Sequence, residues 1–329
     1  MHAEGVADRG DQVAEVGSGQ HQLGERLGKL LDVHDAIVRD TAARGGYQLL
    51  PDFCSDVGNA HHSMHLIPAV SVPEVQRVDQ VVGSAASPAL RALLDGPRTA
   101  GRVVHAGRQA VYADLGSRVV GVLARGAVHV PCAAQTALTD LPEVALGAPV
   151  VAGAGLLRVG PLTVAVTRLV RFAVAPLGPG AARRLRAVPA DLSPARDQLP
   201  AGALDRLACG DPAAVPALVG RGDGLTPVGD DVLAGWLVAT RAAGGDTGAV
   251  AEALADQLPR TTGLSAALLR HAADGEAIAP FRRALATGDA DAVAVLLAVG
   301  HTSGAGMLLG AHLALSASIT HEALEGSTR

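Results

Sequence analysis

A chain of 329 residues, 49% of them hydrophobic, can bury one large or two medium cores, and this composition excludes a mainly disordered protein. The net charge of −5 arises in the leader: residues 1–82 carry 6 basic and 12 acidic side chains, whereas residues 83–329 carry 21 and 20. Because the main body is nearly neutral and poor in aromatic residues, we expect no nucleic-acid partner.

The cysteines and the length of the apolar runs predict the cellular compartment of the protein. Cys54, Cys132 and Cys209 lie far apart without a C-x-x-C pair, which argues against both a zinc ribbon and a disulfide framework. No apolar run reaches the roughly 20 residues that span a bilayer, and the start resembles no signal peptide. We therefore expect a cytoplasmic protein without a membrane partner.

Residues 1–83 form the first expected segment. They hold six of the twelve histidines, and their apolar residues follow no sustained period. His61, His62 and His65 have a spacing that could ligate a metal, but no acidic or cysteine partner follows at a matching distance. We expect a poorly ordered N-terminal extension, or a spurious one translated from an over-extended start codon.

Residues 84–175 have a β-like pattern of short valine-rich runs, separated by glycine, proline or polar residues at barrel- or sandwich-like spacings. Gly107-Arg108 and Gly116-Ser117 are plausible hairpin turns. The expected strands are Val103–Ala106, Ala110–Leu115, Val119–Leu123, Ala127–Val130, Leu156–Val159 and Leu162–Val170.

Residues 176–200 are predicted to be a connector, residues 201–320 a helical domain and residues 321–329 a tail. The fold class is therefore α+β: a β-rich, barrel- or sandwich-like N-terminal half followed by an all-helical C-terminal half. The expected helices are Ala203–Cys209, Pro227–Ala243, Gly248–Leu258, Thr262–Ala273, Ile278–Ala286, Ala290–Val299 and Thr302–Thr320.

A glycine loop precedes the predicted helix Pro227–Ala243, which is mostly apolar from Val232 onward. Gly220, Gly222 and Gly224 alternate ahead of Thr226, a natural N-cap, and Pro227, which suits the first helical position. Free N–H groups and the positive end of the helix dipole would face this loop, which is typical of an anion site. The spacing matches neither a Walker loop nor a dinucleotide-binding fingerprint.

Asp230 and Asp231 follow in the first helical turn. They either complement the helix dipole at the surface, or orient a donor amine or hold Mg²⁺. Two carboxylates cannot both face an anion, so we expect one of them to point to a cation, an amine or a backbone donor.

Two further segments have the same character. Arg260–Ser265 places a cation and hydroxyls at a helix start, with Thr261 as the capping residue, and Gly300–Gly306 is a second glycine- and hydroxyl-rich start. Since one Ser, Thr or Asp suffices to cap a helix, the surplus glycines indicate a ligand close to the backbone. We expect the three segments to converge on one cleft lined by four residues: Thr226, Asp230, Ser265 and His301.

These segments carry a resemblance. Gly222-Asp223-Gly224-Leu225-Thr226-Pro227-Val228-Gly229-Asp230-Asp231, then Thr261–Ser265 and Gly300-His301-Thr302-Ser303-Gly304, resemble the bacterial AllH family, which includes a subunit of oxamate carbamoyltransferase. The likeness covers roughly residues 84–320. Val228 stands where the family usually has serine, Gly306 where it often has aspartate, and Asp223 where proline is frequent.

The resemblance implies a role in carbamoyl transfer, in which oxalurate and phosphate give oxamate and carbamoyl phosphate, together with other protein subunits. Both substrates are small anions suited to a helix-terminus pocket. Asp230, Asp231 and His301 are the expected catalytic residues, with His301 as a proton shuttle and Mg²⁺ as the only cofactor considered. The expected anion-binding residues are Gly222, Gly224, Thr226, Gly229, Arg260 as a clamp, Thr262, Ser265, Thr302, Ser303 and Gly304.

Two other functions stay open at this stage. The first is a non-catalytic anion-sensing or assembly subunit that uses the same pocket. The second is a metal-dependent hydrolase centred on Asp230 and Asp231, which is disfavoured because no further ligand lies at an obvious spacing.

Overall fold

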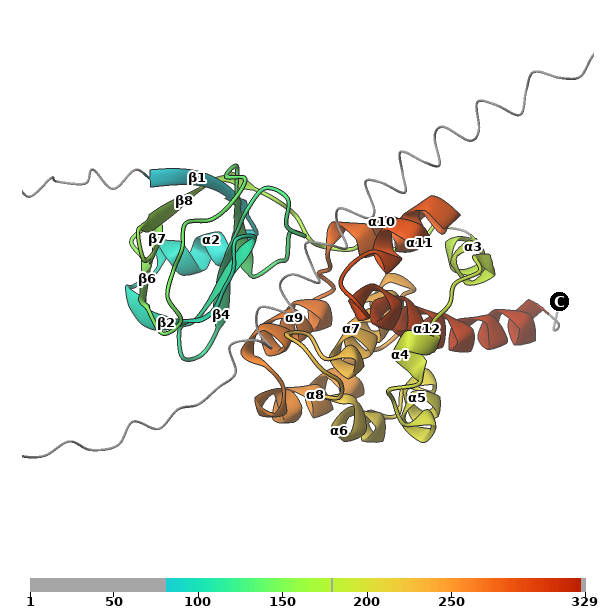
Figure 1. Ribbon diagram of the computed structural model, residues 1–329. Coiled ribbons are helices and arrows are strands. Elements are labelled where there is room, and N and C mark those ends of the chain that lie inside the picture. The colour runs from blue at the N-terminus through green and yellow to red at the C-terminus, as the bar shows by residue number, and fades with distance from the viewer. Residues whose placement is uncertain (1–80, 179, 327–329) are drawn as a thin grey trace, which may run out of the picture.

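A computed structural model describes residues 81–178 and 180–326, with side chains described up to Ser316. The expectations for the leader, including His61, His62 and His65, lie outside the described residues. The rest of the chain forms a β-barrel followed by a bundle of helices, which lie side by side in Figure 1. The predicted α+β class, with a barrel as one of its two options, is confirmed.

The barrel is closed, in the strand order β1-β5-β4-β3-β2-β6-β7-β8, and parallel pairing of β8 with β1 completes it. Closure leaves no sheet edge on which another chain could add a strand. The strands are β1 Val81–Ala86, β2 Thr99–Ala106, β3 Ala110–Asp114, β4 Val119–Leu123, β5 Ala133–Thr136, β6 Pro149–Gly153, β7 Leu156–Val159 and β8 Leu162–Leu169.

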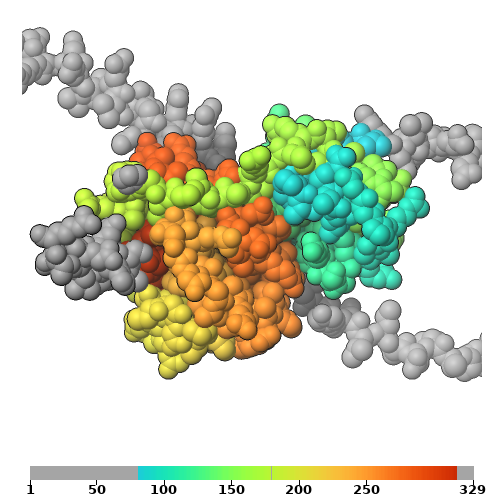
Figure 2. All heavy atoms as spheres, turned by 180° about the vertical axis from the view of Figure 1, so that it is seen from behind, coloured from blue at the N-terminus to red at the C-terminus, as the bar shows by residue number. Residues whose placement is uncertain are grey.

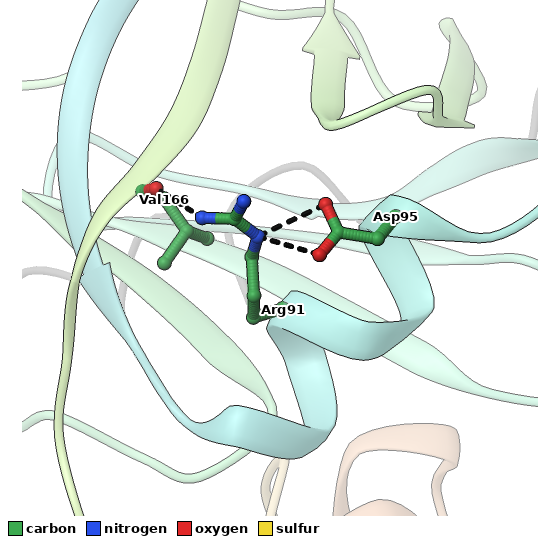
Figure 3. Close-up of polar contacts among 3 residues, drawn as sticks. All are labelled: Arg91, Asp95 and Val166. Carbon is green, nitrogen blue, oxygen red and sulfur yellow. Dashed lines mark hydrogen bonds and ion pairs between the residues drawn. The ribbon is translucent and has the colours of Figure 1, made fainter.

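Helix α2 (Pro88–Asp95) packs against β6, β7 and β8 and was not predicted. The hydroxyl of Ser87 caps it by accepting from the backbone N–H of Leu90 at 3.1 Å, and Leu90 is buried in the barrel core. Figure 3 shows the two contacts of Arg91: within the helix its Nε donates to the carboxylate of Asp95, and its Nη1 donates to the carbonyl of Val166 in β8 at 2.9 Å, which ties the helix to the barrel.

One predicted strand is wrong, and the first strand begins earlier than expected. Residues 127–130 form a loop, because the amide of Gln135 donates to the carbonyl of Ala127 at 2.8 Å and curls the chain before β5. Strands β1, β5 and β6 were not predicted, since alanine and glycine dilute their β-branched residues. Strand β1 starts at Val81, three residues before the start predicted for the β-rich segment.

The helical bundle surrounds α7, which is buried along most of its length. Its neighbours include α9 and α12. The helices are α3 Ala181–Ala187, α4 Ser193–Arg196, α5 Ala201–Ala208, α6 Val215–Leu218, α7 Val228–Ala242, α8 Gly248–Gln257, α9 Gly263–Ala273, α10 Ala279–Thr287, α11 Ala290–Leu297 and α12 Ser303–Gly326, with 3₁₀ turns at Pro212–Ala214 and Leu258–Arg260.

The predicted connector is part of this bundle. Helices α3 and α4 lie within residues 176–200, and Leu185 and Ala195 are fully buried in the helical core. Prolines around and within these short helices gave the sequence its loop-like appearance, but each helix still contributes a buried apolar side chain.

Glycines let α7 and α12 touch through their backbones. A Cβ atom on Gly235 would lie 2.1 Å from the carbonyl oxygen of Met307, and one on Gly310 would lie 2.1 Å from that of Val232. No side chain fits in so little space, so these glycines set the distance between the two helices.

One of the two hydrophobic clusters joins the barrel to the bundle, while the other fills the barrel itself. Tyr112, Leu123 and Cys132 of the barrel belong to the same buried cluster as the helices. The backbone strengthens this junction, because the N–H of Ala277 donates to the carbonyl of Phe172 at 2.9 Å. In Figure 2 the barrel and the helical residues near 250–280 meet without a gap on the face shown. Within the described ranges, no helix has the length and apolar character needed to cross a bilayer.

Candidate functional site

Helix α7 begins one residue later than expected. Its N-cap is Pro227, whose carbonyl accepts from the backbone N–H groups of Asp230 and Asp231 at 2.9 and 3.2 Å. The predicted cap, Thr226, instead has its hydroxyl 3.0 Å from the Ser303 hydroxyl. This contact joins the glycine loop to the start of α12, so the capping role of Thr226 was wrong.

The buried side chain of Asp230 joins the glycine loop to the start of α9 through hydrogen bonds. It is 1% exposed and accepts from the Gly220 N–H at 2.8 Å, from the Ser265 hydroxyl at 2.7 Å and from the Thr261 hydroxyl. Burial raises the pKa of its carboxyl, and these three hydrogen bonds oppose that rise. Thr261, expected to cap α9, is occupied by Asp230, and Thr262 caps that helix through the Ser265 N–H at 3.0 Å.

Asp231 has different surroundings. It is 7% exposed, and its Oδ2 atom has no hydrogen-bond partner in the protein. Burial raises the pKa of this carboxyl well above its ordinary value, and the hydroxyls of Ser303 and Thr226 oppose the shift only in part. The side chain lines a cavity between the barrel and the bundle.

The cavity has a volume of about 290 Å³ and is mostly apolar. It lies where residues from β2, β3, β4 and the loop after β4 face the starts of α7 and α12 and one side of α9. Its lining residues are His105, Gln109, Ala110, Tyr112, Leu123, Gly126, Ala127, Val128, Val130, Pro131, Leu225, Thr226, Asp231, Ala234, Val238, Leu264, Leu268, Ala272, Glu276, Ala277, Ile278, Phe281, Ala298, Val299, Gly300, Ser303 and Met307.

Few polar groups interrupt the apolar walls. No arginine or lysine is among the described residues that line the cavity. Burial lowers the pKa of His105, which favours its neutral form. Glu276 lies 2.6 Å from Nδ1 of His271. The starts of α7, α10 and α12 also contribute lining residues, so the positive ends of three helix dipoles lie near the cavity.

The three predicted segments do meet, but most of the predicted residues lie outside the cavity lining. Asp230 joins the glycine loop to Thr261 and Ser265, and the Thr262 hydroxyl donates to the carbonyl of Leu225 at 2.5 Å. The predicted residues that line the cavity are Thr226, Asp231 and Ser303; those that do not are Gly222, Gly224, Gly229, Asp230, Arg260, Thr262, Ser265, His301, Thr302 and Gly304.

Two of the expected ligand contacts lie at the surface. His301 is exposed, on the turn before α12. Arg260 is also exposed and donates to the carbonyl of Pro216 at 3.1 Å and to the amide oxygen of Gln257 at 2.7 Å. The guanidinium therefore links α6 to the end of α8 at the surface and does not line the cavity, contrary to the expected clamp.

The glycines have two different explanations. A Cβ atom on Gly229 would lie 2.1 Å from the carbonyl oxygen of Leu218, and one on Gly304 would lie 1.9 Å from that of Leu296, so helix packing requires them. At Gly222 a Cβ would meet the backbone nitrogen of Val228 at 2.9 Å. Gly224 differs: its φ of +91° favours glycine, yet a Cβ there would meet nothing within 4 Å.

The residues do not fit a magnesium site. Both oxygens of Asp230 are occupied by protein donors, which leaves Asp231 as a single carboxylate. Among the described residues, no group of three or more His, Cys, Asp or Glu side chains could hold a metal ion.

The sequence analysis missed the barrel side of the site. His105, Gln109 and Tyr112 line the cavity, although each looked like an ordinary strand or turn residue. One signal was present: Gly121 pairs with Tyr112 across β3 and β4, and a Cβ there would lie 2.6 Å from the tyrosine ring. A glycine in a valine-rich strand can mark a place where a neighbouring ring lies over the backbone.

Comparison with known proteins bears on the helical half of this site. A family model described as oxamate carbamoyltransferase subunit AllH matches residues 218–315. The match includes all three predicted segments and Asp231, while the barrel residues of the cavity lie before it. No solved structure matches the chain.

Proposed function

We propose, from the premise that the chain belongs to the AllH family over residues 218–315, that it is a subunit of a carbamoyltransferase and that the interdomain cavity holds the ureide substrate. The reaction would convert oxalurate and phosphate to oxamate and carbamoyl phosphate, in an assembly with other protein subunits. One observation carries the proposal: the family match spans Asp231, whose side chain lines the cavity and whose carboxyl is buried with the Oδ2 atom unpaired. A cytoplasmic location stays a prediction from the sequence.

The chemistry gives Asp231 a role. When a phosphate oxygen attacks the carbamoyl carbon of oxalurate, the bond from that carbon to the imide nitrogen breaks, and this nitrogen must gain a proton. A buried carboxyl with a raised pKa keeps its proton at a pH where free aspartate is ionised. Asp231 would donate this proton, and the proton lost by the attacking phosphate would restore the carboxyl.

The rest of the cavity would position the ureide. Its single carboxylate suits the starts of α10 and α12, where the positive ends of the helix dipoles favour a negative charge. The hydroxyls of Thr226 and Ser303 would hold the reacting group beside Asp231, and Tyr112 and Phe281 would exclude water from it.

Activity of the assembled enzyme tests this proposal. Carbamoyl phosphate formation is measured with the partner subunits, using the wild-type chain and Asp231→Asn. We expect the variant to lose about 100-fold or more in kcat, the usual contribution of a general acid. Asp223→Asn, a change at an exposed loop position, is the matched control and should retain activity. Unchanged activity of Asp231→Asn, or full activity of the partners alone, would contradict the proposal.

A non-catalytic binding or assembly subunit is the second candidate. The observation that favours it is the lack of arginine and lysine on the described lining, since phosphoryl compounds are commonly held by these cations. In that case Asp231→Asn would raise KM, or weaken assembly, and leave kcat at saturating substrate unchanged.

A further inference from the structure

Tyr112 lies on the outer side of the barrel and faces the helical bundle. Its neighbours in β3, Val111 and Ala113, are buried in the core of the barrel, whereas Tyr112 belongs to the cluster that joins the barrel to the bundle. Side chains alternate between the two faces of a strand, which explains this difference. Tyr112 therefore extends from the barrel toward the cavity between the two domains, which it lines.

The hydroxyl of Tyr112 has no partner in the protein. Among the described residues, none forms a hydrogen bond with it, and it is not one of the fully enclosed side-chain atoms that lack a partner. Its oxygen therefore keeps an accessible surface. Because the residue is only 7% exposed and lines the cavity, this surface opens to the cavity. A buried tyrosine hydroxyl usually has a hydrogen-bond partner, so a free one at a cavity wall indicates that a ligand supplies it.

The ring of Tyr112 is held in place by its surroundings. It lies over the backbone of Gly121 in β4, where a Cβ atom would be 2.6 Å from the ring. The imidazole of His105 lies beside it, with the two ring centroids 6.0 Å apart. The position of the hydroxyl is therefore set before a ligand binds, which is the condition for a hydrogen-bond donor that acts in catalysis.

The hydroxyl is also kept protonated. Burial raises the pKa of Tyr112 well above its ordinary value, so the group remains a neutral donor at neutral pH. No arginine or lysine is among the described residues of the lining, and burial lowers the pKa of His105, which favours the uncharged imidazole. A negative charge that develops in the cavity therefore has few donors to meet it, and Tyr112 is one of them.

The proposed reaction develops such a charge. When a phosphate oxygen bonds to the carbamoyl carbon, one electron pair of the carbonyl moves onto the carbonyl oxygen. When this tetrahedral intermediate collapses, the carbonyl re-forms, the bond from carbon to the imide nitrogen breaks, and the nitrogen takes the proton of Asp231. The carbonyl oxygen is an oxyanion only between these two steps, so a fixed donor aimed at it lowers the barrier.

We propose that Tyr112 donates a hydrogen bond from its hydroxyl to this oxyanion, which makes it a further catalytic residue and makes the barrel part of the active site. The inference rests on the proposed function, because it takes carbamoyl transfer to occur in this cavity. Tyr112 lies outside residues 218–315, so the family match does not itself assign it a role. Asp231 of the bundle and Tyr112 of the barrel then act on different atoms of the substrate.

Tyr112→Phe removes the hydroxyl and keeps the ring. In the assembled enzyme, kcat for carbamoyl phosphate formation should fall about 100-fold, the usual effect of losing one oxyanion donor. KM should change by less than about threefold, since the lost hydrogen bond strengthens only in the transition state. Thr99→Val is the matched control: it removes a hydroxyl of the barrel at an exposed position outside the lining and should leave both constants unchanged.

Thermal unfolding of the chain separates a catalytic role from a structural one. Because the hydroxyl has no partner in the free protein, Tyr112→Phe should shift Tm by no more than about 2 °C. A hydroxyl that holds the fold together would instead lower Tm when it is removed. The expected result is therefore a large loss of kcat with an unchanged Tm.

Three results would overturn the inference: an unchanged kcat, a raised KM with kcat retained, or a loss of kcat accompanied by a clear fall in Tm. Failure of the inference alone would appear as a wild-type assembly that is active, Asp231→Asn that is not, and Tyr112→Phe that is fully active. A wild-type assembly that makes no carbamoyl phosphate would overturn the proposed function and this inference with it.

Discussion

The two aspartates in the first turn of α7 differ in the hydrogen bonds that their carboxyl groups make with the protein. On the interior face, Asp230 accepts three hydrogen bonds and fastens the glycine loop to α9. On the cavity face, one oxygen of Asp231 has no partner. Residues adjacent in sequence point about 100° apart on a helix. One aspartate therefore joins segments of the fold, while the other lines the cavity and is the residue that we propose as catalytic.

The largest expected effect follows from removing the interior carboxylate. Asp230→Ala should lower the free energy of unfolding by about 3 kcal/mol, because the Gly220 N–H and the Ser265 hydroxyl lose a charged acceptor in a buried place. Urea denaturation measures the loss. Asp223→Ala, at an exposed site, should change it by less than about 0.5 kcal/mol. A loss below about 1 kcal/mol for Asp230→Ala would show that the hydrogen bonds accepted by Asp230 do not stabilise the fold as described.

A smaller loss of stability is expected from substitutions of glycine, and its size should differ between a glycine packed against a neighbouring helix and a glycine in the loop. Gly304→Ala should cost about 2–3 kcal/mol, since the new Cβ would lie 1.9 Å from the Leu296 carbonyl oxygen and force α12 to shift. Gly224→Ala should cost only about 1 kcal/mol, from the positive φ alone. Thermal unfolding of both variants gives the comparison. Equal losses would contradict the division into packing and loop glycines.

The smallest predicted effect is a gain in the free energy of unfolding when Asp231, the aspartate that lines the cavity, is replaced. Asp231→Asn should raise the free energy of unfolding at pH 7 by about 1 kcal/mol, because an amide is neutral in the folded and the unfolded chain, whereas an aspartate that is ionised in the unfolded chain must take up a proton or bury its charge on folding. The pKa of Asp231 is higher in the folded than in the unfolded chain. Wild-type stability therefore declines as the pH rises from the unfolded pKa to the folded one.

In Asp231→Asn the free energy of unfolding does not fall with pH in this way, because asparagine does not titrate. Urea titrations at pH 4 and pH 7 should therefore show a difference between variant and wild type that is larger at pH 7. A variant less stable than the wild type at pH 7 would mean that the ionised carboxylate has a partner in the folded protein.

Much of the fold could be predicted from periodicity and turn residues. Valine-rich runs between glycines predicted five of the eight strands, and apolar runs with capping residues predicted the longer helices. The prediction failed where an element is short and rich in alanine, such as β5, or where proline separates short helices, such as α3 and α4. In those places the tertiary core provides the stabilisation that local propensity does not.

The candidate site was predictable as a region and not as a set of contacts. The three segments were expected to converge, and they are joined by the hydrogen bond that Asp230 accepts from Thr261 and by the one between the Thr226 and Ser303 hydroxyls. Their glycines were interpreted as room for a ligand, whereas Gly229 and Gly304 lie against backbone carbonyls. A sequence records that a side chain is absent, but only coordinates show what occupies the space.

By itself, the sequence determined the order of the two domains, the placement of both aspartates in the first turn of α7, and the resemblance to the AllH family. These are local properties, because helix periodicity, capping and motif order depend on residues near one another in the chain. The tertiary structure alone decided which aspartate faces the cavity, and that the barrel supplies His105 and Tyr112 to its wall. A cavity between domains depends on how two packed surfaces meet, and residues more than 100 positions apart carry no local signal of that contact.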